Sequence, residues 1–140
     1  MDDSTFPTDN ASDVAVTVVT TYLPGHSKPE QNQFVFAYTI TISNSGDVPV
    51  QLLSRHWIIT DADNEVQEVR GEGVVGEQPV IPPTKSFRYT SGATLATPVG
   101  CMEGSYTMVR CLSEDQESLA TGQFEVPIPA FSLHTPTAVH

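Results

Sequence analysis

The sequence predicts an all-β protein that folds as a sandwich of two antiparallel sheets with about seven to eight strands. Apolar residues alternate along short segments or cluster as β-branched runs, and Gly, Pro and Asn residues separate these segments. No segment of twelve or more residues keeps an uninterrupted helical apolar period. The 11 prolines agree, because proline favours sheet edges and loops over helix interiors.

The strands are expected in the following order. The first covers residues 14–23, with Val14, Val16 and Val18 in phase, and the second covers 34–43 with its aromatic and Ile residues on one face. Turns at 44–47 and 61–64 bound a third strand over 48–60, and a fourth over 65–70 leads into a glycine segment. Three more are expected over 85–92, 105–112 and 121–128, the last two joined by the turn "SEDQES". The expected core comprises Phe36, Tyr38, Ile40, Trp57, Tyr106 and Met108.

The domain organisation is expected to be simple: an acidic, flexible N-terminal segment over residues 1–13 and one domain over 14–140. Six Lys and Arg residues against 17 Asp and Glu residues give a formal charge of −11. Phosphate backbones and anionic membrane surfaces attract the opposite charge, so we expect neither a nucleic-acid nor a membrane partner. The first residues do not resemble a secretory signal, and no apolar run approaches the ~20 residues of a membrane helix. We therefore expect a cytoplasmic protein.

The two cysteines are expected to be reduced thiols. Cys101 and Cys111 flank a segment that resembles one strand. Ten residue steps of ~3.3 Å would separate the ends of a continuous strand by roughly 33 Å. A disulfide requires Cα atoms within ~7 Å, so these residues should not pair with each other.

The segment "RGEGVVGE", residues 70–77, contains the G-x-G-x-x-G spacing of dinucleotide-binding loops. That site requires a helix directly after the glycines, because the helix N-terminus holds the pyrophosphate. Pro79, Pro82 and Pro83 follow instead and exclude such a helix. The acidic residue expected ~20 positions later is also missing.

Two interpretations of the glycine segment remain. In the one that we favour, Gly71, Gly73 and Gly76 permit positive φ angles and a tight turn. In the alternative, their amides form an anion nest for a phosphate or nucleotide, assisted by the cationic residues near in sequence. The candidate binding residues are then Arg70, Gly71, Gly73, Gly76, Lys85 and Arg88. Glu72 and Glu77 would oppose such a ligand.

Two further patterns suggest chemistry and have simpler explanations. Asp61, Asp63, Glu65 and Glu72 occupy acidic positions of a calcium-loop register, but Val66 stands where that loop requires glycine. A hairpin turn capped by Asp and Asn side chains explains the pattern better. Ser54 and His56 in "SRHW" suggest a hydrolase, but strand neighbours point to opposite faces and no G-x-S-x-G elbow occurs. We expect Trp57 to fill the core and the polar residues to line a sheet edge or an interface.

Five segments together resemble the ApaG family: "SRHWIITDAD", "VRGEGVVGEQPVI", "RYTSG", "TPVGCMEGSYTM" and "FEVPIPAFSL". The resemblance runs from about Val14 to the C-terminus. It implies an immunoglobulin-like or fibronectin-type-III-like sandwich, and places the suggested phosphate motif at Gly71, Gly73 and Gly76. Two turn positions depart from the family pattern, since Asn64 and Thr84 stand where glycine is usual.

The resemblance implies a function without an established biochemical activity. Bacterial members are linked to cobalt resistance and magnesium efflux, related domains in F-box proteins are interaction modules, and members are often dimers. The leading hypothesis is a non-enzymatic interaction module with no cofactor, an unidentified protein partner and a possible homodimer. The alternatives are weak phosphate or nucleotide binding by the glycine segment and a divalent-metal site of surface carboxylates. No linear motif supports a metal site, so none of its residues can be named.

Overall fold

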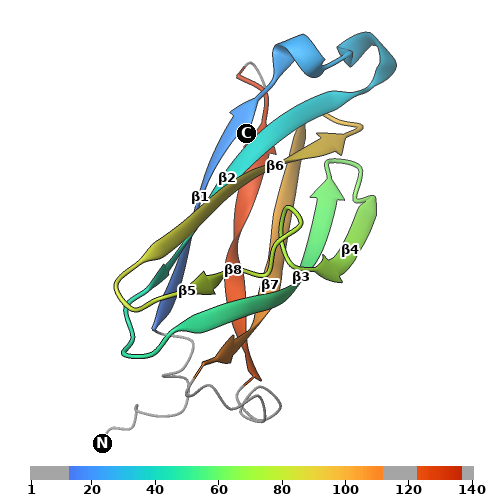
Figure 1. Cartoon of the computed structure of the whole chain (residues 1–140). Coiled ribbons are helices and arrows are strands. Elements are labelled where there is room, and N and C mark those ends of the chain that lie inside the picture. The colour runs from blue at the N-terminus through green and yellow to red at the C-terminus, as the bar shows by residue number, and fades with distance from the viewer. Residues whose placement is uncertain (1–12, 112–122, 137–140) are drawn as a thin grey trace, which may run out of the picture.

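The computed structural model describes residues 13–111 and 123–136 and confirms the predicted fold class (Figure 1). Two antiparallel sheets form a sandwich, and two short 3-10 helices, η2 (Pro24–His26) and η3 (Pro29–Gln31), lie in one loop. The strands are β1 (Val14–Tyr22), β2 (Phe34–Asn44), β3 (Val50–Asp61), β4 (Val66–Glu72), β5 (Val80–Ile81), β6 (Ser86–Leu95), β7 (Val99–Arg110) and β8 (Gln123–His134). The expected N-terminal segment, except Asp13, and the turn "SEDQES" lie outside the described residues.

One sheet has three strands in the order β1-β2-β6. The other has five: β4, β3, β7 and β8 lie side by side in that order, and the short β5 pairs with the first residues of β3. The chain thus returns from β3 into β4 at the edge of the second sheet before it crosses to β6 in the first. Figure 1 shows the β3–β4 hairpin projecting at one side of the sandwich, with β4 as its outermost strand.

The strand predictions agree with the structure, with three differences. Strand β8 ends at His134, six residues beyond its expected end, because Pro127 and Pro129 interrupt the strand pattern there. Strand β7 begins at Val99, six residues before its expected start, because two glycines and a register shift between Met102 and Gly104 hide the strand pattern. Strand β5 was not predicted. It has only two residues, too few for any periodicity, and its pairing with Val50 and Gln51 comes from tertiary structure.

The predicted core is confirmed, since all six residues named from the sequence are buried. Trp57 lies at its centre with 2% of its surface exposed. Its ring meets those of Tyr38 and Tyr106 edge to face, with centroids 5.5 Å and 6.5 Å away, and that of Phe131 at 5.9 Å. Aromatic quadrupoles favour such edge-to-face arrangements.

Both cysteines are free, as predicted: Cys101 is exposed near the start of β7, and Cys111 directly follows the end of that strand. Burial raises the pKa of both thiols, and the charge of Glu103 adds to the effect at Cys101. A raised pKa disfavours the reactive thiolate. None of the helices that the structure describes has the length and apolar character needed to span a bilayer.

Candidate functional site

The glycine segment forms a tight hairpin turn. Val74 and Glu77 exchange both of their backbone hydrogen bonds, with N–O distances of 2.8 Å and 2.9 Å. Between them Val75 and Gly76 have φ angles of +43° and +82°. Positive φ at both central residues defines a type I′ turn, in which a β-branched residue such as Val75 is unusual. Strand β5 follows the turn, so no helix stands behind these glycines, as Pro79, Pro82 and Pro83 predicted.

Hydrogen bonds to protein acceptors occupy most amides of the turn. The Gly73 amide donates to the carbonyl of Leu53 at 2.8 Å, and the Gln78 side chain donates to the same carbonyl at 2.9 Å. Together with the Val74–Glu77 exchange, these contacts dock the turn onto β3. The amides of Val75 and Gly76 have no backbone acceptor among the described residues and remain for an anion.

Arg55 holds the start of the turn, a role that the sequence analysis missed. Its Nη1 donates to the carbonyls of Glu72 at 3.2 Å and of Gly73 at 2.8 Å. The guanidinium lies over Gly71, where a Cβ atom would come within 2.8 Å of Nη1. Gly71 pairs with Arg55 across the β3–β4 hairpin, so the missing side chain makes room for the guanidinium. Alternation in "SRHW" was the available signal, because it places Arg55 on the inward face with Trp57.

A hollow of about 320 Å³ lies between the turn and the three-stranded sheet. Arg55, the turn tip at Val75 and Gly76, and hydroxyl-bearing residues that include Tyr89 line it. The hydroxyl group of Tyr89 lies 2.5 Å from that of the buried Tyr106. Burial raises the pKa of Tyr89 to about 12 and also raises the pKa of Tyr106, so both phenols are neutral near pH 7.

The predicted binding residues divide into two groups in the structure. Gly71, Gly73, Gly76 and Arg70 line hollows beside the turn. Lys85 and Arg88 line none of these three hollows. Lys85 directly precedes β6 at the end where its carbonyl accepts from Asn44, and Arg88 pairs with Thr41 on the three-stranded sheet. Arg55, which was not predicted, is the cation that shares a hollow with the turn tip at Val75 and Gly76.

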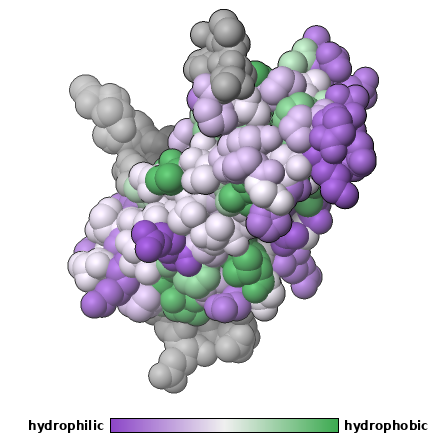
Figure 2. Space-filling view, turned by 90° about the horizontal axis from the view of Figure 1, so that it is seen from above, coloured by the Kyte–Doolittle hydropathy of each residue, from purple (hydrophilic) through white to green (hydrophobic). Residues whose placement is uncertain are grey.

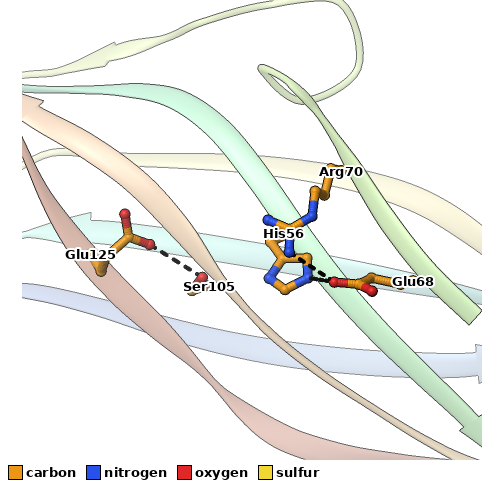
Figure 3. Close-up of polar contacts among 5 residues, drawn as sticks. All are labelled: His56, Glu68, Arg70, Ser105 and Glu125. Atoms are coloured by element: carbon orange, nitrogen blue, oxygen red, sulfur yellow. Dashed lines mark hydrogen bonds and ion pairs between the residues drawn. The ribbon is translucent and has the colours of Figure 1, made fainter. Parts of the chain in front are cut away.

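A row of polar side chains crosses the outer face of the five-stranded sheet (Figure 3). On β3 the His56 Nε2 lies 2.6 Å from Oε2 of Glu68, which also accepts from Arg70 at 2.9 Å. The hydrogen bond with His56, followed by the charge of Arg70, lowers the pKa of Glu68. Across the row, Ser105 and Thr107 on β7 donate to Glu125 on β8.

Ser54 and His56 share this outer face, which corrects one step of the sequence argument. Alternation separates Arg55 from both of them but leaves the two on the same side, and they line one hollow of about 430 Å³. Within residues 13–111 and 123–136 no hydrogen bond joins His56 to Ser54 or Ser105; its ring bonds Glu68 instead. The predicted sheet edge is wrong for Ser54 and His56, because β3 lies between β4 and β7; a role in an interface stays a prediction.

The acidic residues at 61–65 close the β3–β4 hairpin. The Asp61 carboxylate accepts from the amides of Asp63 at 2.8 Å and Glu65 at 3.0 Å, and Asn64 has a φ of +66°. The capped-turn interpretation is confirmed for Asp61, whose carboxylate is committed to the turn, whereas Asn64 contributes its left-handed backbone. In the part of the chain that the structure describes, no group of three or more His, Cys, Asp or Glu side chains could hold a metal ion.

Strand β4 is exposed on both faces and packs extensively only on β3 among the described elements. Bonded and non-bonded pairs alternate along an antiparallel ladder. The Asp61 amide donates to the Glu65 carbonyl at one end of the hairpin, and the Gly73 amide donates to the Leu53 carbonyl at the other. These two bonds determine which residues of β4 direct their backbone groups toward β3. The backbone groups that point away from β3 therefore belong to Val66, Glu68, Arg70 and Glu72. Of these, the Glu72 carbonyl already accepts from Arg55.

Comparisons with known proteins agree with this geometry. A family model described as the ApaG domain matches residues 24–110. The chain is 55% identical over 128 residues to Protein ApaG of Ralstonia nicotianae, covering 91% of this chain and 97% of the relative. It is 55% identical to Protein ApaG of Pseudomonas aeruginosa, covering 94% and 98%. A solved structure from Bordetella pertussis, described as an ApaA protein, superposes with a TM-score of 0.80 at 49% identity, covering 90% and 96%. The chain therefore belongs to the ApaG family.

Proposed function

We propose that this chain is a non-enzymatic interaction module that binds an extended polypeptide segment along the free edge of β4. The observation that carries the proposal is the double exposure of β4, a seven-residue strand at the end of its sheet. An edge strand presents unpaired N–H and C=O groups, and an incoming strand satisfies them as it extends the sheet.

The character of the surface fits this mode of binding. Figure 2 shows a face on which hydrophilic and weakly polar side chains predominate and apolar atoms form small separate groups. On β4 itself the polar and charged side chains are exposed together with Val66 and Val69, so a partner would gain affinity from main-chain hydrogen bonds as well as from apolar burial. The outer-face row with His56, Glu68 and Arg70 lies beside the edge and would select the side chains of the partner.

Site-specific photo-crosslinking tests the proposal. The photoreactive residue p-benzoylphenylalanine would replace Gln67 on β4 in one chain and Thr17 on β1, an exposed strand position, in the control. We expect polypeptide adducts at position 67 and none at 17. Glu68→Pro should abolish the adducts, because it removes an outward N–H without removing a β3–β4 hydrogen bond. Equal adducts at both positions, or adducts that survive Glu68→Pro, would refute the edge as the binding surface.

Weak phosphate or nucleotide binding at the glycine turn is the second candidate function. It is favoured by one observation, the convergence of Arg55 with the unpaired amides of Val75 and Gly76 on the same hollow. Two glutamates beside the turn oppose it, and no helix dipole assists, so we expect millimolar affinity at best, roughly 4 kcal/mol.

Amide chemical shifts test this second candidate. Pyrophosphate or ATP should shift the resonances of Val75 and Gly76, and Arg55→Gln should weaken the response while Arg88→Gln leaves it unchanged. The expected dissociation constant is about a millimolar or weaker, so the test requires several millimolar ligand. If the amide chemical shifts of Val75 and Gly76 do not change at that concentration, the phosphate hypothesis is refuted.

The proposed location is the cytoplasm, where an acidic interaction module would meet protein partners. The link of the family to cobalt resistance and magnesium efflux would then act through the partner. We assign no cation to this chain, because the Asp61 carboxylate is committed to the hairpin turn and the Glu68 carboxylate is paired with His56 and Arg70.

A further inference from the structure

The free edge of β4 carries alternating charges in a self-complementary order. Glu68 and Arg70 are two residues apart, so both side chains lie on the outer face and both backbones face away from β3. Two identical strands that pair antiparallel about a two-fold axis place residue i opposite a fixed residue j, and j opposite i. Whether β4 suits a second copy of itself therefore depends on which residues each register opposes.

One register uses all four outward residues and opposes unlike charges. With the axis at Val69, Glu68 lies opposite Arg70 of the second copy, Arg70 lies opposite Glu68, and Val66 lies opposite Glu72 in both directions. With the axis at Glu68 the two Glu68 carboxylates would face each other. With the axis at Arg70 the two guanidinium groups would do so. Like charges directly opposite each other destabilise a strand pair, and unlike charges stabilise it.

The surroundings of the edge agree with the register centred on Val69. On the other face of β4, the two Val69 side chains would meet at the axis, and Val69 is 36% exposed in the single chain. Gly71 would lie opposite Gln67 and has no side chain to obstruct the approach. A chain with a formal charge of −11 repels its copies, so a register that opposes unlike charges suits it better than one that opposes like charges.

We propose that β4 pairs with β4 of a second copy of this chain, antiparallel and about a two-fold axis at Val69. The two β3–β4 sheets then form one continuous sheet across a homodimer, with Glu68 of each copy opposite Arg70 of the other. This inference rests on the proposed function, because it names the partner of the same edge. It adds a register, which the function alone does not require.

Charge reversal tests the paired charges. Sedimentation of the intact chain at tens of micromolar should give a dimer, while Glu68→Arg and Arg70→Glu should each raise the dissociation constant by about 10- to 100-fold. An equimolar mixture of the two variants should restore association, as a heterodimer, because Arg at 68 then meets Glu at 70. Glu103→Arg, an exposed position on β7 of the same sheet, is the matched control and should leave the dimer unchanged. Variants whose urea midpoints show loss of folding are replaced by the milder Glu68→Gln and Arg70→Gln.

Disulfide capture tests the register without altering either charge. In this register Val69 lies opposite Val69 of the second copy, as a non-hydrogen-bonded pair between the two bonded Glu68–Arg70 pairs. The Cα atoms of such a pair are about 4.5 Å apart, which suits a disulfide between copies. In a chain with Cys101 and Cys111 replaced by serine, Val69→Cys should form a linked dimer on mild oxidation. Val66→Cys should not, because position 66 lies opposite position 72 rather than itself.

The outcomes separate this inference from the proposed function. A monomer mass at tens of micromolar, a dimer indifferent to both charge reversals, or equal crosslinking at positions 66 and 69 would overturn self-pairing. Adducts of position 67 with another polypeptide would leave the proposed function standing in that case. Absence of any adduct at position 67, together with a monomeric chain, would overturn both.

Discussion

Replacing Gly73 or Gly76 by alanine separates the two explanations of the glycine segment. Both glycines have positive φ angles, +67° and +82°, so alanine at either position incurs the cost of the left-handed region, about 1–2 kcal/mol. At Gly76 nothing lies within 4 Å of the added Cβ, and this cost is the whole expected effect. Gly76→Ala should therefore lower the free energy of unfolding by about 1–2 kcal/mol.

At Gly73 a second cost is added. The new Cβ would lie 2.3 Å from the carbonyl oxygen of Glu77, which must move away. That oxygen accepts the Val74 amide, and the reverse bond from Glu77 to Val74 closes the same turn. Losing one or both bonds costs about 0.5–1.5 kcal/mol each, so Gly73→Ala should destabilise the fold by about 1.5–5 kcal/mol in total.

Urea unfolding followed by tryptophan fluorescence measures both losses, because Trp57 is the single tryptophan and is buried. The slope of the transition should stay constant, and only its midpoint should fall. The losses should be the same with and without pyrophosphate, since the strain belongs to the backbone. Equal losses for the two variants, or a loss at Gly73 that appears only with ligand, would refute this explanation.

Three other predictions concern the core, the buried phenols and a strained turn. Trp57→Ala should cost about 3–5 kcal/mol of unfolding free energy, and a loss below about 1 kcal/mol would contradict its place in the core. Burial raises the pKa of Tyr89 to about 12 and raises that of Tyr106, against about 10 in the unfolded chain. The stability that the two neutral phenols contribute is complete below pH ~10 and is lost as the pH rises through their pKa values in the folded protein. Urea midpoints should therefore fall above pH ~10. The fall should be smaller in Tyr89→Phe, which lacks one of the two phenols. Thr84 is β-branched with a φ of +66°, so Thr84→Gly should relieve backbone strain. After the entropy cost of glycine is subtracted, the free energy of unfolding should rise by up to about 1 kcal/mol, and the melting temperature should rise with it. An unchanged or lower melting temperature would show that the turn bears no strain.

The fold could be predicted because its signals are local. Alternation in β2 places Phe36, Tyr38 and Ile40 on one face, and the same three residues are buried in the sandwich. Turn residues marked most strand ends to within a few positions; the start of β7 and the end of β8 were missed by six residues each. The departures at Asn64 and Thr84 were visible as well, and both prove to stand at left-handed positions where glycine has no steric cost.

The site could be predicted only in part, because its geometry depends on pairing between strands. Arg55 meets the glycine segment only because the hairpin register sets it opposite Gly71, and no rule of spacing within either strand contains that fact. Lys85 and Arg88 were nearer in sequence to the glycines than Arg55, yet they line none of the hollows around the turn. Closeness along the chain was a poor guide, since a strand rises ~3.3 Å per residue and carries its residues away from the turn quickly.

The free edge of β4 could not be predicted from the sequence either, because it depends on how the strands are ordered in the sheet. Its sequence "VQEVRGE" could pair on both sides, and only the topology leaves one side open, because the chain returns along β3 and then crosses to β6. Once that side is known to be open, an acid and a base two residues apart acquire a meaning that they lack in the sequence. In an antiparallel pair about a two-fold axis, such a spacing opposes each charge with its complement. The same two residues pair within one strand at 2.9 Å in the single chain, so the association exchanges contacts that already exist for contacts between copies. Each Glu68 or Arg70 side chain that leaves its partner in the same chain gains the same kind of partner in the second copy. The charges therefore determine the register of the pairing more than its strength. Most of the affinity must come from the main-chain hydrogen bonds.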